Sequence, residues 1–126
     1  MRFQTLGWAM AVVVAAAAPC AAASLKAIMR SWKADRATIE RVVSGRTSFD
    51  EAALRAILDG FASDARSIEA RISAPGERSK DLRGRFVQFE TDAAAARAAL
   101  GPNDRWKPRA AHLIDDCQSC HDVYAN

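Results

Sequence analysis

Cysteine, histidine and proline are scarce in this chain of 126 residues, which has three cysteines, two histidines and four prolines. Two of the cysteines, Cys117 and Cys120, are too close together to link distant segments of a fold by a disulfide. The scarcity argues against a small domain held together by disulfides. It also suggests that these two thiols are present for chemistry.

A strong charge of one sign is also lacking. The chain carries 18 basic and 15 acidic residues, a net charge of +3, and the two signs are interspersed. This balance is too even to indicate a nucleic-acid surface, and we expect no nucleic-acid partner. No grouping of Ser, His and Asp, no inward pair of carboxylates and no phosphate-binding glycine loop is recognisable. The sequence therefore favours a protein that is not an enzyme in the strict sense.

The first 23 residues have the layout of a secretory signal peptide. One early positive charge, Arg2, precedes an apolar run rich in alanine and valine, and the small residues Ala21 and Ala23 suit cleavage after Ala23. An uncleaved membrane anchor and a lipid-modified Cys20 are the alternatives, and Pro19 disfavours both. We expect export to the periplasm and cleavage near Ala23. A single domain of 103 residues, 24–126, would remain.

Strand-like alternation of apolar and polar residues is missing as well, whereas four stretches repeat apolar residues at steps of three and four. Short connections between helices of this length favour antiparallel neighbours. We therefore expect an all-α fold, an antiparallel up-down-up-down four-helix bundle. The expected helices run from Leu25 to a cap at Gly45, from a capping box of Ser48 and Glu51 to the break at 74–76, from Leu82 to Gly101-Pro102, and from Trp106 or Pro108 to Tyr124.

Against this background, the last twelve residues gather two cysteines and a histidine into five positions. On a helix, residues i, i+3 and i+4 share one face, so Cys117, Cys120 and His121 should lie together, facing the bundle. Two such thiols can add across the two vinyl groups of one porphyrin while the imidazole reaches the iron. Cys-x-x-Cys-His is the attachment motif of c-type haem. The motif predicts one covalent haem c, held by Cys117 and Cys120, with His121 on the iron.

Cysteines and a histidine at this spacing have two other common uses. A thioredoxin-like pair needs a βαβ context and a helix N-terminus that lowers the thiol pKa, and the predicted fold offers neither. A structural zinc site needs four ligands, and the only other histidine, His112, should face nearly the opposite side of the helix. A thiol–disulfide enzyme that uses Cys117 and Cys120 stays open as an alternative.

The C-terminal segment Cys117-Gln-Ser-Cys120-His121-Asp-Val-Tyr124 resembles that of the cytochrome c-prime family, the class II cytochromes c. In that family the distal haem residue stands sixteen positions before a glycine and twenty before a Phe-Asp pair, and Met29, Gly45 and Phe49-Asp50 have this spacing. The resemblance continues through Leu82 and the run Phe86-Val-Gln-Phe89-Glu90. Ala125, Arg83 and Leu25 stand where members commonly have arginine, tryptophan and arginine, respectively.

The resemblance implies that the residue at position 29 decides the function. Many members have a leucine or another non-ligand there and bind NO or CO, whereas methionine ligates iron in a low-spin branch. A thioether ligand at Met29 implies an electron carrier in the periplasm, serving periplasmic or membrane-bound redox proteins. NO or CO binding is the alternative, and a homodimer is left open. The expected walls of the haem pocket are Trp32, Phe86, Phe89 and Ile114.

Overall fold

The computed structural model describes residues 24–125, which form four helices and, within that range, no strand. The helices are α1 (Leu25–Val43), α2 (Glu51–Arg71), α3 (Glu77–Ala98) and α4 (Trp106–Tyr124). The predicted all-α fold is confirmed. The predicted signal peptide, its cleavage after Ala23 and the alternatives for Cys20 lie outside the described residues. No helix between residues 24 and 125 is both long and apolar enough to cross a bilayer.

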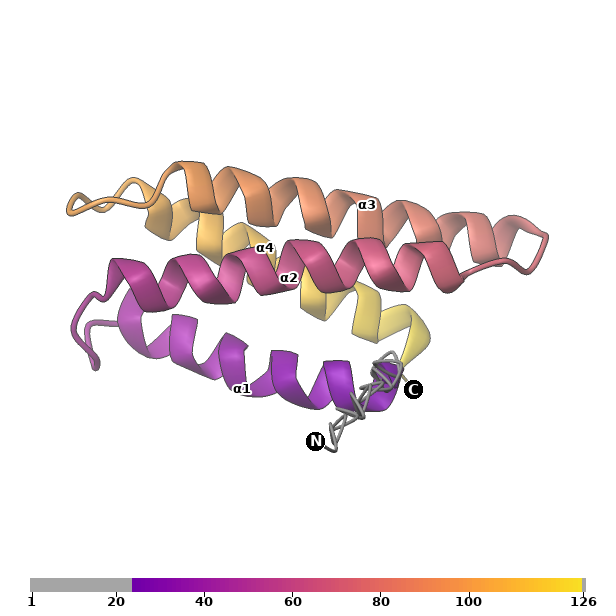
Figure 1. Ribbon diagram of the computed structural model, residues 1–126, viewed down its shortest axis with the longest axis horizontal. Coiled ribbons are helices and arrows are strands. Elements are labelled where there is room, and N and C mark those ends of the chain that lie inside the picture. Colours follow the sequence, from indigo (N-terminus) through magenta and orange to yellow (C-terminus); the bar gives the residue numbers. More distant parts are fainter. Residues whose placement is uncertain (1–23, 126) are drawn as a thin grey trace, which may run out of the picture.

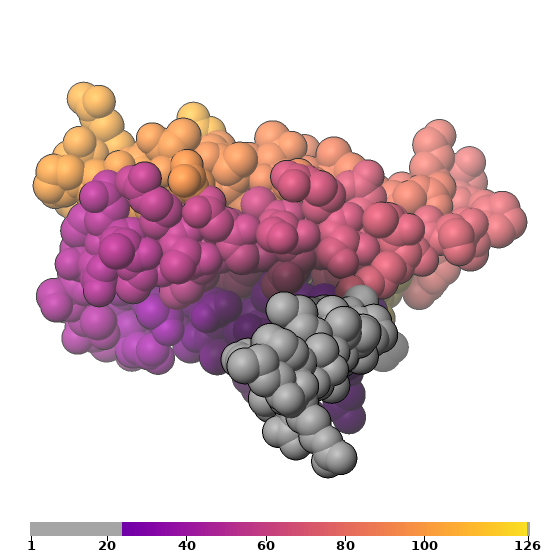
Figure 2. Space-filling model, in the orientation of Figure 1, coloured from indigo at the N-terminus to yellow at the C-terminus, as the bar shows by residue number. Residues whose placement is uncertain are grey.

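Each helix packs against two neighbours, in the order α1, α2, α3, α4 and back to α1. Short connections join them at alternate ends, as Figure 1 shows. On the face in Figure 2, the side chains of α2 form a continuous band between those of α1 and α3. Packing is extensive between α2 and α3 and between α3 and α4, and sparser around α1. In Figure 1, α4 runs from the side of α3 toward the beginning of α1, so the first turns of α1 and the last turns of α4 lie at the same end.

Apolar residues spaced at steps of three and four fill the centre of the bundle, as the sequence predicts. Ile39, Leu54, Leu58 and Leu113 are the most completely enclosed large side chains. Burying a side chain of this size contributes about 1.5–3 kcal/mol relative to leaving it in water. The remaining core residues are Ile28, Trp32, Val42, Phe61, Ala65, Ile68, Phe86, Phe89, Ala93, Ala96, Trp106 and Ala110.

The helix ends agree with the sequence in part. Gly45 follows α1 with φ of 76°, a left-handed conformation that glycine adopts without strain, as expected of a C-terminal cap. The predicted capping box at Ser48 is wrong: Asp50 caps α2, and its Oδ1 accepts a hydrogen bond from Ala53 N at 3.0 Å. The third helix begins at Glu77 rather than Leu82. Its first turn is polar and exposed, so it adds nothing to the apolar pattern.

Candidate functional site

A cleft of about 580 Å³ lies between α1 and α4. This volume is within the range of about 300–1,000 Å³ typical of small-molecule and cofactor sites. The cleft lies where α1 packs sparsely against α4, which is itself packed extensively against α3. Its lining residues come from those two helices and are Lys26, Met29, Arg30, Trp32, Lys33, Arg36, Cys117 and His121.

A smaller, mainly apolar cavity of about 40 Å³ has Met29, Trp32, Cys117 and His121 in common with the cleft. It extends the space toward α3. The other residues that line it are Arg85, Phe86, Phe89, Asp116 and Cys120. Six of the seven residues expected to contact a cofactor, together with His121, therefore line one or both spaces. The exception is Ile114, which packs against the hydrophobic core instead.

Both cysteines are free thiols on the last turns of α4, and both are half-buried. Burial raises the pKa of Cys117 to about 11, and it also raises the pKa of Cys120. The carbonyl end of a helix disfavours a thiolate as well. The two sulfurs are therefore protonated near neutral pH, which is the reverse of the lowered thiol pKa that disulfide exchange requires.

His121 and Met29 reach the cleft from different helices. His121 follows Cys120 on α4 and is exposed, so its imidazole is accessible from the cleft. Met29 is on α1, half-buried, and packs against the edge of the core. A nitrogen donor and a soft sulfur donor thus line the same space, in keeping with the face predicted for each helix.

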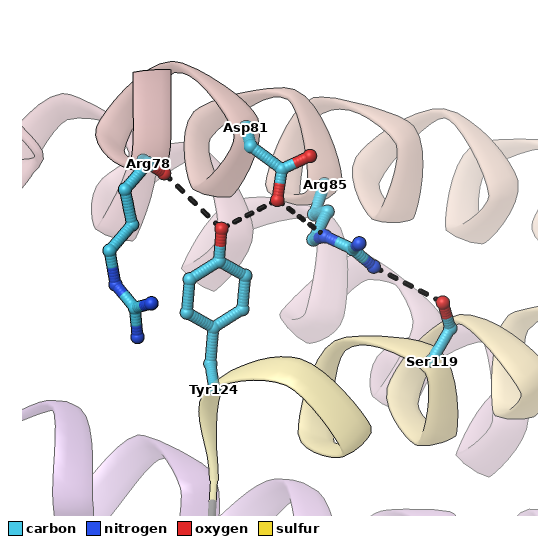
Figure 3. Close-up of polar contacts among 5 residues, drawn as sticks. All are labelled: Arg78, Asp81, Arg85, Ser119 and Tyr124. Carbon is cyan, nitrogen blue, oxygen red and sulfur yellow. Dashed lines mark hydrogen bonds and ion pairs between the residues drawn. The ribbon is translucent and has the colours of Figure 1, made fainter. Parts of the chain in front are cut away.

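Polar contacts between α3 and α4 hold the segment that carries the two cysteines. Tyr124 Oη donates a hydrogen bond to Asp81 Oδ2 and also lies 3.2 Å from the carbonyl oxygen of Arg78. Arg85 forms an ion pair with Asp81 at 2.9 Å and donates a hydrogen bond to Ser119 Oγ at 3.1 Å. Figure 3 shows these contacts converging on the last turns of α4. Sequence reasoning missed them because they depend on how the two helices are aligned.

Basic side chains surround the mouth of the cleft. Lys26, Arg30 and Lys33 are exposed on the face of α1 that lines it. Arg36, one turn further along, forms an ion pair with Glu40 at 2.9 Å. This arrangement would favour a ligand that carries negative charge at the solvent edge.

Asp115 and Asp116, which precede Cys117, differ in their exposure. Asp115 is exposed, but Asp116 is only partly exposed and one of its oxygens is buried beside Asp92 of α3. Burial and the neighbouring Asp92 raise the pKa of Asp116 to about 7. Burial opposes ionisation of Asp92 too, but hydrogen bonds from Asp116 and Gln88 lower the pKa of that carboxyl. His112 is exposed and lies beside this pair.

No family model, no curated protein and no solved structure matched the chain. The fit of a cofactor therefore depends on the donors and on the walls of the two spaces. Two accessible thiols one turn apart, with an imidazole beside them, suit covalent attachment of a porphyrin and ligation of its iron. Trp32, Phe86 and Phe89 supply an apolar wall. The basic side chains at the mouth of the cleft, here called the basic rim (Lys26, Arg30 and Lys33), suit the two propionates of a haem. These residues fit a haem c.

Proposed function

We propose that the chain is a monohaem c-type cytochrome of the periplasm, similar to the low-spin branch of the cytochrome c-prime family, that transfers single electrons between redox proteins. The observation that carries the proposal is the cleft that Met29 of α1 lines together with Cys117 and His121 of α4. A cleft with these donors on opposite walls is what a six-coordinate haem needs.

Each lining residue has a role that follows from its chemistry. Cys117 and Cys120 would each form a thioether: a new S–C bond joins the thiol sulfur to one vinyl carbon, and hydrogen adds to the other. His121 Nε2 or Nδ1 would ligate the iron from α4, and the thioether of Met29 from α1. The bound haem would supply a reversible one-electron couple. The cleft residues fix its orientation and exclude water from its faces.

The apolar wall and the basic rim would tune this couple. A methionine ligand favours ferrous iron because its soft thioether binds that oxidation state better. A surrounding of low dielectric constant favours it too, since less positive charge is then held in an apolar site. Trp32 and Phe89 provide such a surrounding from α1 and α3. Lys26 and Arg30 lie at the mouth of the cleft, where they could pair with propionates. The propionates would then face solvent.

The thiol–disulfide alternative is disfavoured by the raised pKa of Cys117, because a protonated thiol is a poor nucleophile. Binding of NO or CO uses the same haem and differs only in whether Met29 occupies the iron. Export to the periplasm rests on the sequence of residues 1–23, and cleavage after Ala23 would retain Ser24. Ser24 Oγ caps α1 by accepting a hydrogen bond from Ala27 N at 3.1 Å.

The test is production of the full chain in bacteria with an intact periplasmic haem-attachment system, followed by mass and absorption measurements. We expect a mass gain of one haem that survives acid–acetone extraction, a low-spin spectrum and little CO binding at neutral pH. Cys117→Ser/Cys120→Ser should abolish the covalent mass gain. A mature protein without a Soret band contradicts the proposal. A high-spin spectrum with ready CO uptake supports gas binding instead.

A further inference from the structure

Three side chains that can bind metal meet between α3 and α4. Asp92 comes from α3, and His112 and Asp116 come from successive turns of α4. One ligand atom from each lies within 4.8 Å of the other two. His112 Nε2 and Asp92 Oδ2 are 3.3 Å apart. Two ligands of a tetrahedral ion are separated by roughly 3.3 Å when each bond is about 2.0 Å long.

The carboxylates of Asp92 and Asp116 each have one oxygen that lacks a hydrogen-bond donor of its own. Asp92 Oδ2 and Asp116 Oδ2 are buried. Neither oxygen accepts a hydrogen bond from an N–H or hydroxyl group of the described residues. Gln88 Nε2 donates to the other oxygen, Asp92 Oδ1, at 3.0 Å. Gln88 thereby holds the carboxylate with Oδ2 turned toward His112, 3.3 Å from its Nε2. Two facing carboxylate oxygens without separate donors need a proton or a cation between them.

We propose that Asp92, His112 and Asp116 form a binding site for a divalent transition-metal ion, with Zn²⁺ as the best match. Two carboxylate oxygens and one imidazole nitrogen are ligands that zinc accepts, whereas the imidazole disfavours Mg²⁺ and Ca²⁺. His112 is 60% exposed at its side chain, so water can complete the coordination. Gln88 acts as a positioning residue of the kind that commonly supports metal ligands.

The site is separate from the donors of the proposed haem. It uses neither cysteine, and His112 lies more than two helical turns before His121 on α4. It does lie next to Cys117, because Asp116 precedes that residue in the chain. An ion bound here would join α3 to α4 at the level of the first cysteine. The inference does not depend on the proposed function.

The test is titration of the purified, metal-depleted full chain with ZnCl₂ at pH 7.5 by isothermal calorimetry, repeated with MgCl₂. We expect one Zn²⁺ per chain, at least tenfold weaker binding in His112→Ala and in Asp116→Asn, and no comparable binding of Mg²⁺. Gln88→Ala should weaken Zn²⁺ binding less than either ligand substitution. Circular dichroism verifies the fold of each variant, and the exposure of His112 makes unfolding of His112→Ala unexpected.

Asp115→Asn is the matched control, because it removes the same charge from the neighbouring position, outside the cluster. It should leave zinc affinity within about twofold of the wild type. The proposal is overturned if Asp115→Asn weakens binding as much as Asp116→Asn, because the effect is then one of net charge. It is also overturned if His112→Ala binds zinc as well as the wild type, or if Cys117→Ser/Cys120→Ser abolishes binding.

Discussion

Trp32 Nε1 donates a hydrogen bond of 3.0 Å to Asp64 Oδ2, joining the middle of α1 to α2. The same indole stacks on Phe89 of α3, with ring centroids 4.6 Å apart, and lines the cleft. Since α1 packs sparsely against its neighbours, Trp32 is a principal anchor of this helix. Met29, three positions earlier on the same helical face, depends on that anchor for its place in the cleft.

Trp32→Phe should lower the free energy of unfolding by about 1–2 kcal/mol, because it removes a hydrogen bond to a carboxylate while retaining an aromatic ring. Urea unfolding followed by circular dichroism measures the loss. Asp64→Ala should cost a similar amount, and the double variant should cost less than the sum of the two. Strictly additive costs would show that the indole–carboxylate bond does not contribute.

Asp50→Ala should lower the free energy of unfolding by about 1 kcal/mol, because Asp50 caps the first turn of α2. Ser48→Ala, two positions earlier, should change it by less than about 0.5 kcal/mol. The pair of variants separates the cap seen in the structure from the capping box that the sequence suggests. Equal losses in the two variants would contradict the assignment of Asp50 as the cap.

The fold could be predicted because each helix carries its own apolar period. Ile28, Trp32 and Ile39 mark the buried face of α1 without knowledge of any other segment. Helix ends were less predictable: Ser48 and Asp50 are both good caps, and only the path of the loop selects between them. The first turn of α3, beginning at Glu77, is polar and gives no apolar signal.

The candidate site also has a part that the sequence predicts and a part that only the structure reveals. Cys117, Cys120 and His121 lie within two turns of one helix, so helical spacing alone brings them together. Asp92 and Asp116 meet only because of the register between α3 and α4, and that register is set by packing around residues such as Leu113. No local pattern distinguishes Asp116 from its exposed neighbour Asp115. The contact between Asp92 and Asp116 could therefore be found only from the structure.

Tyr124→Phe should loosen the last turn of α4, because it removes the hydrogen bond to Asp81. Hydrogen exchange of the amides after Cys120 should be faster in this variant. Hydrogen bonds from Tyr124 and Arg85 lower the pKa of Asp81 below its usual 3.8. A lowered carboxyl pKa stabilises the folded chain above pH 3.8, and this stabilisation is lost as the pH falls through the lower value.

The pH dependence provides the check on this interaction. The urea midpoints of wild type and Tyr124→Phe should differ at pH 7 and converge toward pH 3. Asp81→Asn should reproduce the loss at pH 7 and show less change on acidification. A difference between wild type and Tyr124→Phe that stays constant from pH 7 to pH 3 would contradict the role of the Asp81 carboxylate.

Leu113→Ala should lower the free energy of unfolding by about 2–5 kcal/mol, because Leu113 is fully buried and its truncation leaves a cavity. Val123→Ala lies on the same helix, and Val123 is 48% exposed. It should cost less than about 0.5 kcal/mol. Chemical denaturation of both variants tests whether α4 is packed in the described orientation. A larger loss in Val123→Ala than in Leu113→Ala would mean that α4 presents another face to the core.

If the proposed function holds, Met29→Ala should convert the low-spin haem into a high-spin one, because truncation removes the only methionine that lines the cleft among the described residues. The ferric charge-transfer band of methionine ligation should disappear, and the ferrous form should gain CO binding. Leu25→Ala, one turn earlier on α1 and half exposed, is the matched control and should keep the wild-type spectrum. An unchanged spectrum in Met29→Ala would rule out ligation and leave Met29 as a packing residue. The electron-carrier proposal would then lose the feature that distinguishes it from gas binding.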